Sequence, residues 1–318
     1  MVTDKASSPI SRFKDMMSGV IVGNESAIQL ALVAFLTEGH VLIEDVPGVG
    51  KTLLARTFAR CLGLEFRRIQ FTPDLLPSDI TGVNVFNPKT LEFEFKPGPV
   101  FCDILLADEI NRATPRTQSS LLECMEERQV TIDGVTHKLS PLFTVLATQN
   151  PIELQGTFPL PEAQMDRFLM RIHLGYPDED QEAEILQRFE QGSDISLGPP
   201  ITREEIAELK QGVTQVYLSD DLKTYITNIC RRTRTLDTVE LGASPRATLS
   251  LARACKAYAF VEGRSFVLPD DVKALAVPVL AHRLVVSQDS FIRGISAHDI
   301  VMQVLDDVPV PIGENTHR

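Results

Sequence analysis

The sequence has no cysteines spaced as pairs and no histidines at a metal-binding spacing. Its five cysteines are an odd number, and no two are close in sequence, so neither a disulfide framework nor a C-x-x-C metal site fits. We expect them to be buried, reduced thiols, as is usual in the cytosol. The six histidines include no H-x-x-x-H pair, which argues against a zinc ion held by protein ligands.

Basic charge and long apolar runs are also scarce. The 318 residues carry a formal net charge of −12, and a dedicated DNA-binding domain usually presents a strongly basic face, so no nucleic-acid partner is expected. No apolar run approaches the ~20 residues that span a bilayer. The N-terminus also lacks the apolar core of a signal peptide. We therefore expect a cytoplasmic protein without membrane insertion.

Short apolar runs alternate with helical patterns over the first 175 residues. Continuous apolarity is typical of strands that are buried on both faces, so the runs predict a mostly parallel, five-stranded sheet in an α/β fold. Ligands of such a sheet bind at the carboxyl ends of its strands. The runs are VLIED (41–45), FRRIQF (66–71), DILLAD (103–108), FTVLATQ (143–149) and FLMRIHL (168–174).

The pattern changes after residue 176, where strand signals fade. GSDISLGPP over 192–200 is typical of a linker, and helical patterns follow it. We therefore expect a core domain over 1–198 and a smaller all-helical domain over 199–318. Two insertions interrupt the core, at about 72–101 and 128–139. The second carries Asp-Gly at its centre, which predicts a hairpin turn.

IEDVPGVGKT at 43–52 is typical of a phosphate-binding loop between a strand and a helix. Glycines there let backbone N–H groups point at phosphate oxygens, and the helix that follows adds its N-terminal dipole. In this pattern Lys51 reaches the β and γ phosphates of ATP, and the Thr52 hydroxyl coordinates Mg²⁺. The predicted nucleotide-binding residues are Asp45, Val46, Pro47, Gly48, Val49, Gly50, Lys51, Thr52 and Leu53.

Asp45 departs from this pattern, which has glycine at its position. A carboxylate aimed at a triphosphate would be repelled. We therefore predict that the Asp45 side chain turns away and accepts local hydrogen bonds from backbone or hydroxyl groups, as aspartate does in turns.

A second motif, DILLADEINRATP, brings two acids to the end of a buried strand. We predict that Asp108 holds Mg²⁺ through its water shell and that Glu109 polarises the attacking water as a general base. The next strand ends in ATQNP. Asn150 is therefore expected beside the acids, where its amide can hold the water near the γ phosphate; the alternative is a turn-forming asparagine before proline.

GVGKT, LLADEINRATP, ATQNP, LPEAQMDRF and GASPRA, in this order and spacing, resemble the MoxR-type AAA+ ATPases. The resemblance covers nearly the whole chain. It implies an AAA+ core with a helical lid, ATP and Mg²⁺ as cofactors, and self-assembly into a ring, usually a hexamer. It also implies a chaperone-like role towards partner proteins, often von Willebrand A (VWA) domain proteins or metalloenzyme complexes.

The resemblance also gives roles to three arginines and to both insertions. Arg167 resembles the family's arginine finger, Arg246 resembles its second sensor, and Arg112 is a candidate for a subunit boundary. The segment 72–101 matches the helix-2 insert, and 128–139 matches the pre-sensor hairpin. Together with Glu109 and Asn150, the three arginines complete the predicted catalytic set.

Three other functions remain open on the sequence. A nucleic-acid motor of a related AAA+ branch is disfavoured, because the hairpin offers only Arg128, His137 and Lys138 near its ends and Asp133 at its tip. A magnesium-chelatase-like metal-insertion ATPase shares both core and lid, so only its partners would distinguish it. A nucleotide-binding scaffold without turnover is disfavoured by the complete set of predicted catalytic residues.

Overall fold

The computed structural model describes residues 8–151, 156–190 and 198–311. The predicted linker lies largely outside this range. The chain forms two compact units. The first contains residues 1–160 and 172–209, and the second contains 161–171 and 210–318. The short segment 161–171 therefore packs with the C-terminal part of the chain.

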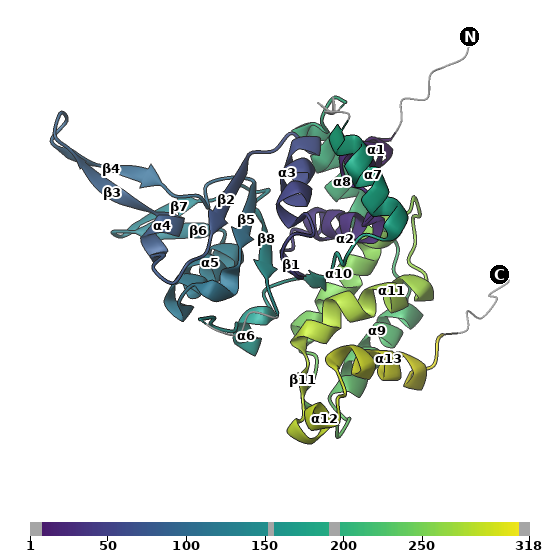
Figure 1. Cartoon of the computed structure of the whole chain (residues 1–318). Coiled ribbons are helices and arrows are strands. Elements are labelled where there is room, and N and C mark those ends of the chain that lie inside the picture. The colour runs from purple at the N-terminus through teal and green to yellow at the C-terminus, as the bar shows by residue number, and fades with distance from the viewer. Residues whose placement is uncertain (1–7, 152–155, 191–197, 312–318) are drawn as a thin grey trace, which may run out of the picture. The chain divides into compact units, whose positions relative to one another are not determined.

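A five-stranded sheet in the order β2-β5-β8-β1-β9 forms the framework of the first unit, and the division between the units falls within its end strand β9, after residue 171 (Figure 1). The pairs β2–β5, β5–β8 and β1–β8 are parallel, as the continuous apolar runs predicted. Every residue of β5 is buried. The strands are β1 (Val41–Glu44), β2 (Phe66–Gln70), β5 (Ile104–Asp108), β8 (Thr144–Gln149) and β9 (Met170–Ile172).

Helices pack onto this sheet through apolar side chains. Phe58 of α3 lies edge-on to Phe13 of α1 and Phe35 of α2, with ring centroids 5.3 and 5.9 Å apart. All three rings are fully buried. The longer helices that begin in this unit are α1 (Pro9–Val20), α2 (Glu25–Leu36), α3 (Lys51–Cys61), α5 (Pro115–Glu127), α7 (Glu179–Glu190) and α8 (Arg203–Gln215), and the short ones are α4 (Pro77–Thr81) and η1 (Ile110–Arg112).

Both predicted insertions contain hairpins, β3 (Gly82–Asn87) with β4 (Glu92–Pro97), and β6 (Gln129–Ile132) with β7 (Val135–Lys138). Asp133 and Gly134 have φ values of 48° and 81°, which is the left-handed turn that Asp-Gly favours. The two hairpins lie near each other, at the left of Figure 1.

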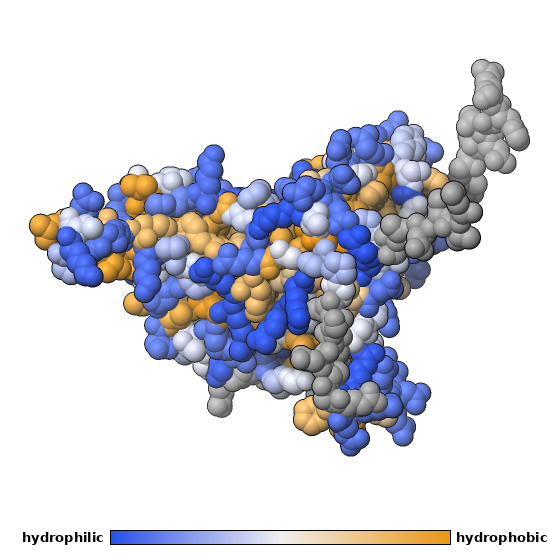
Figure 2. Space-filling view, turned by 90° about the horizontal axis from the view of Figure 1, so that it is seen from above, coloured by the Kyte–Doolittle hydropathy of each residue, from blue (hydrophilic) through white to orange (hydrophobic). Residues whose placement is uncertain are grey.

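Side chains join the two hairpins. The Asn84 amide donates to the Asp133 carboxylate at 2.7 Å, and the rings of Phe95 and His137 stack at 4.1 Å. We call this pair the hairpin module (82–97 and 129–138). Exposed apolar side chains remain on it, and Figure 2 shows apolar patches on the molecular surface; those of the module are Val83, Val85, Phe86, Leu91, Phe93 and Val135.

The second unit is helical, as predicted, apart from one small ribbon. β10 (Val239–Leu241) pairs with β11 (Val285–Val286) in an antiparallel ribbon that the all-helical expectation did not include. Its strands are two and three residues long, too short to leave a clear alternating pattern. The helices are α6 (Glu162–Met165), α9 (Asp220–Thr233), α10 (Pro245–Val261), α11 (Pro269–Leu280), η2 (Ala281–Arg283), α12 (Gln288–Ile292) and α13 (Ala297–Asp307).

Candidate functional site

The predicted phosphate loop lies between β1 and α3. Gly48 and Gly50 have φ values of 91° and 89°, a backbone conformation that glycine adopts without steric cost. No atom lies within 4 Å of a Cβ built at either position, so these glycines serve the backbone conformation and leave the loop open. Gly50 is the N-cap of α3, and Lys51 and Thr52 form the first turn. This geometry suits an anion at the helix N-terminus.

Lys51 reaches across the loop. Its ammonium donates to the backbone carbonyl of Asp45 at 2.7 Å. Burial lowers the pKa of Lys51, while the carboxylates of Asp45, Asp108 and Glu109 oppose that shift. The sequence separates these acids from the lysine by up to 58 positions, and the fold brings all three close enough to act on its charge.

The Asp45 carboxylate accepts backbone hydrogen bonds, as the sequence predicted. Oδ1 accepts from the N–H of Val46 at 2.8 Å, and Oδ2 accepts from the N–H groups of Leu174 and Gly175 at 2.6 and 2.7 Å. The last two partners follow β9 and are not local. No local sequence pattern indicates these two partners, because the contact depends on β9 lying next to β1 in the sheet.

The acidic motif is held by β2 and β8, the strands on either side of β5. One oxygen of Asp108 accepts from the Thr148 hydroxyl at 2.6 Å, and the other accepts from Arg68 at 2.7 Å. Glu109 accepts from the Gln70 amide at 2.7 Å and from Arg112 at 3.0 Å. Both acids are therefore fixed by side chains from neighbouring strands.

Thr148 links the two acids directly. Its hydroxyl donates to Asp108 and accepts the backbone N–H of Glu109 at 2.8 Å. Glu109 itself has a φ of 56°, an uncommon value for a residue other than glycine. Sequence reasoning missed Arg68, Gln70 and Thr148, because only the strand order places them beside the acids.

Asn150 is buried directly after β8. Its backbone carbonyl accepts a hydrogen bond from the Asn111 amide at 3.4 Å. β8 pairs with both β1 and β5. Asn150 therefore lies at the carboxyl ends of these parallel strands, the same ends that lead into the phosphate loop and into Asp108 and Glu109. Arg112 forms an ion pair with Glu109 in this same unit. Arg167 and Arg246 belong to the second unit.

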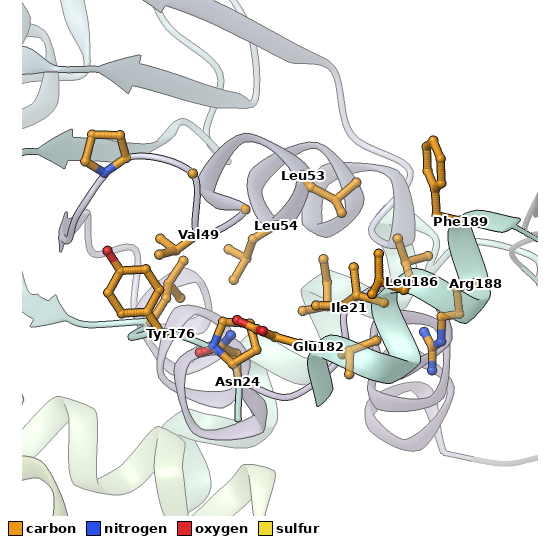
Figure 3. A pocket seen from close by; sticks show the side chains of 18 residues that line it. Ile21, Asn24, Val49, Leu53, Leu54, Tyr176, Glu182, Leu186, Arg188 and Phe189 are labelled. Atoms are coloured by element: carbon orange, nitrogen blue, oxygen red, sulfur yellow. The ribbon is translucent and has the colours of Figure 1, made fainter. Parts of the chain in front are cut away.

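A cavity of about 800 Å³ in the first unit adjoins the phosphate loop. Pro47 to Gly50 form part of its wall, and its other lining is mostly apolar. Figure 3 shows Ile21, Val49 and Leu53 around this space, with Tyr176 and Leu186 from the chain after β9. An apolar cavity beside a phosphate-binding loop fits the planar base of a nucleotide. The sequence did not indicate it, because its walls come from three separate segments.

The described residues contain no group of three or more histidine, cysteine, aspartate or glutamate side chains arranged to hold a metal ion. All five cysteines are buried, and none of them forms a disulfide. Within the same range, no helix combines the length and apolarity needed to cross a membrane.

Comparisons with known proteins agree with this architecture. The model of the ATPase family associated with various cellular activities (AAA) matches residues 40–170, and that of the AAA lid domain matches 231–304. A crystal structure of a protein from Cytophaga hutchinsonii superposes with a TM-score of 0.88 at 40% identity, covering 96% of this chain and 95% of that one. These matches define the class as an AAA+ protein with a lid.

Two relatives indicate which family of AAA+ proteins the chain belongs to. Chaperone MoxR1 of Mycobacterium tuberculosis is 42% identical over 92% of this chain and 80% of its own. "Uncharacterized protein YeaC" of Bacillus subtilis is 48% identical over 94% of each chain. The chain therefore belongs to the MoxR family of AAA+ ATPases.

Proposed function

We propose that the protein binds ATP with Mg²⁺, hydrolyses it within a ring of identical subunits, and uses the cycle to remodel or activate a partner protein. The observation that carries this proposal is that Lys51, Asp108 and Glu109 lie close together at the carboxyl ends of the strands. There burial lowers the pKa of Lys51, and three carboxylates oppose that shift. Membership of an ATPase family supports the same reaction.

Each part of the site has a role in this reaction. Backbone N–H groups of 48–52 and the Lys51 ammonium bind the phosphates. Thr52 and Asp108 would hold Mg²⁺, which would neutralise the charge of the phosphates. A site with few protein ligands suits this ion, because Mg²⁺ usually keeps several waters and binds substrate phosphates. Arg68, whose side chain is 45% exposed, can swing away from Asp108 when the ion binds.

Glu109 acts on the attacking water. The Gln70 amide and the Arg112 guanidinium hold its Oε2, so the carboxylate is oriented before the water arrives. Asn150, at the end of the neighbouring strand, holds the water near the γ phosphate. The nucleotide base enters the apolar cavity beside the loop.

Arg167 and Arg246 supply positive charge for the transition state. A guanidinium that reaches the phosphate from a neighbouring subunit is worth roughly 10³–10⁵ in rate. Arg167 acts as this finger, and Arg246 senses the nucleotide from the start of a lid helix. Such an arrangement requires self-assembly, which a hexameric ring would provide, and specific ATPase activity should then rise with protein concentration.

The partner is a protein, for example a VWA-domain protein or a component of a metalloenzyme complex, and the reaction takes place in the cytoplasm. One relative is named a chaperone, which supports this choice. The hairpin module and its exposed apolar side chains offer a surface for force transmission. A metal-insertion ATPase is the alternative, supported by a 28% identical magnesium-chelatase subunit homolog of Methanocaldococcus jannaschii that matches 57% of this chain.

Glu109→Gln tests the proposal. The amide cannot accept the proton of the attacking water, so the variant should bind Mg-ATP and fail to hydrolyse it, which traps the partner in the ATP-bound state. The trapped protein is captured from the native host's lysate with Mg-ATP, with and without nuclease, and bound material is identified by mass spectrometry.

Recovery of a VWA-type or metalloenzyme-assembly protein that resists nuclease treatment supports protein remodelling. Recovery of nucleic acid with replication factors, lost on nuclease treatment, would show that the protein is a nucleic-acid motor. Unchanged ATP turnover by Glu109→Gln would overturn the assignment of the base.

A further inference from the structure

The second unit contains a buried arginine that is held by an ion pair and by hydrogen bonds to backbone carbonyls. Only 3% of the Arg283 side chain is exposed, and its Nε lies 2.8 Å from Oδ1 of Asp166. Its other nitrogens donate to the carbonyls of Val279 at 2.7 Å and Phe168 at 2.8 Å. The His282 ring lies 3.1 Å from the same Phe168 carbonyl. A cation this buried is stable only when it is paired and hydrogen-bonded in this way.

These contacts hold the segment 161–171, which carries the predicted arginine finger. Arg167 stands between Asp166, which forms the ion pair, and Phe168, whose carbonyl receives the hydrogen bonds. The helix α6 just before it is a single turn without buried residues. Apolar packing therefore contributes little before Arg167, where the ion pair of Asp166 with η2 holds the chain. After Arg167, the buried side chain of Phe168 and the hydrogen bonds to its carbonyl fix the backbone together.

The same ion pair also reaches the start of α10. Ser244, the N-cap residue of α10, donates its hydroxyl to Asp166 at 3.4 Å and accepts the N–H of Ala247 at 3.2 Å. Arg246 is the second residue of that helix. Burial lowers the pKa of Arg283 to about 10, Asp166 opposes the shift, and the charge of Arg246 adds to it, which places Arg246 close to the pair.

We propose that the Asp166–Arg283 ion pair is a positioning device that holds Arg167 and Arg246 in a fixed relation, so that the two arginines move as one body. This inference rests on the proposed function, in which both arginines act on the transferred phosphate. Asp166 and Arg283 act through them and are not catalytic residues themselves. Since an error of about 1 Å in position can cost about 100-fold in rate, a loose segment would disable the finger.

The test uses the full chain with Asp166→Asn. ATP turnover is measured at saturating ATP, at protein concentrations where specific activity no longer rises, and affinity is measured with a fluorescent ATP analogue. We expect kcat to fall roughly 10- to 100-fold, while the dissociation constant changes less than about threefold. In a background that carries both Arg167→Ala and Arg246→Ala, Asp166→Asn should cause no further fall beyond about twofold, because its effect acts through those two arginines.

Two further variants separate positioning from folding. Asp271→Asn removes the partner of Arg264 in a second ion pair of this unit (Nη2 to Oδ1, 2.5 Å), whose carboxylate is buried. Among the described residues, the other hydrogen bonds of these two side chains go to Phe266 and Leu268, outside 161–171. It should lower the unfolding midpoint without the loss of kcat. Arg283→Lys keeps the buried positive charge but lacks the planar guanidinium group with its several N–H donors. It should therefore give a smaller loss of kcat than Asp166→Asn.

The outcomes distinguish the two proposals. Normal kcat in Asp166→Asn together with impaired Arg167→Ala overturns the positioning device alone. A further large loss when Asp166→Asn is added to the variant that carries both Arg167→Ala and Arg246→Ala does the same, as does an equal loss in Asp271→Asn. Full activity of Arg167→Ala would instead overturn the finger assignment, and with it this inference.

Discussion

At the scale of single residues, Asp45 shows how a carboxylate can stand where the phosphate-loop pattern has glycine. Both of its oxygens are used by the fold, since they accept the backbone N–H groups of Val46, Leu174 and Gly175. Hydrogen bonds from N–H groups to a charged acceptor are among the stronger ones in proteins. Asp45 therefore ties the phosphate loop to the chain that follows β9.

This role predicts the effect of Asp45→Asn and Asp45→Gly. The asparagine amide would point a donor at N–H groups, and glycine would leave them without an acceptor, so both should lower the free energy of unfolding by about 1–3 kcal/mol. Neither should tighten ATP binding as much as tenfold. Urea unfolding and nucleotide titration measure the two effects. Tenfold tighter binding by Asp45→Gly would mean that the carboxylate faces the triphosphate.

At the scale of elements, the order of strands decides what the sequence could predict. The phosphate loop and the acidic motif are each continuous in sequence, so their residues were predicted together with the strands that carry them. Arg68, Gln70 and Thr148 lie on β2 and β8 and touch the acids only because these strands flank β5. The order β2-β5-β8-β1-β9 differs from the order along the chain, and no local pattern encodes it. The walls of the cavity beside the phosphate loop were missed for the same reason.

The two hairpins give a prediction at this scale. On the β3–β4 hairpin, Phe95 stacks on His137, while Phe93 lies 71% exposed and touches Phe86 of its own hairpin. Phe95→Ala should therefore loosen the β6–β7 hairpin, and Phe93→Ala serves as the matched control. Amide hydrogen exchange over 129–138 should speed up roughly tenfold in the first variant only, the loss of about 1.4 kcal/mol expected for an aromatic pair. Equal exchange in both variants would show that the hairpins are independent.

At the scale of the whole molecule, each unit holds a buried, neutral histidine. In the first unit His40 accepts the N–H of Val145 at 2.9 Å and lies 3.1 Å from the Met125 carbonyl, which fixes one tautomer. Burial lowers its pKa from 6.5 to about 4. In the second unit burial also lowers the pKa of His282, with a further contribution from Arg283. Protonation of either ring would break the hydrogen bond that its free nitrogen accepts or bring a charge into the core.

Stability should therefore fall as the pH drops below 6.5. The unfolded chain binds protons on these histidines near pH 6.5, whereas the folded chain does not bind one on His40 until about pH 4. Between pH 7 and 5 the loss from His40 should be about 2 kcal/mol, measured by urea unfolding at each pH. His40→Asn cannot take up this proton, so its unfolding free energy should depend less steeply on pH. Parallel curves for the two proteins would contradict this account.

The backbone of Glu109 has a consequence for any attempt to make the protein more robust. A left-handed φ of 56° costs a residue with a side chain roughly 1–2 kcal/mol, a penalty that glycine avoids. Replacing the residue proposed as the base with glycine would thus remove this backbone cost. A library selected for heat resistance alone would drift towards glycine at this position and accumulate well-folded proteins that have lost their chemistry. Selection on this scaffold must therefore score turnover and resistance together.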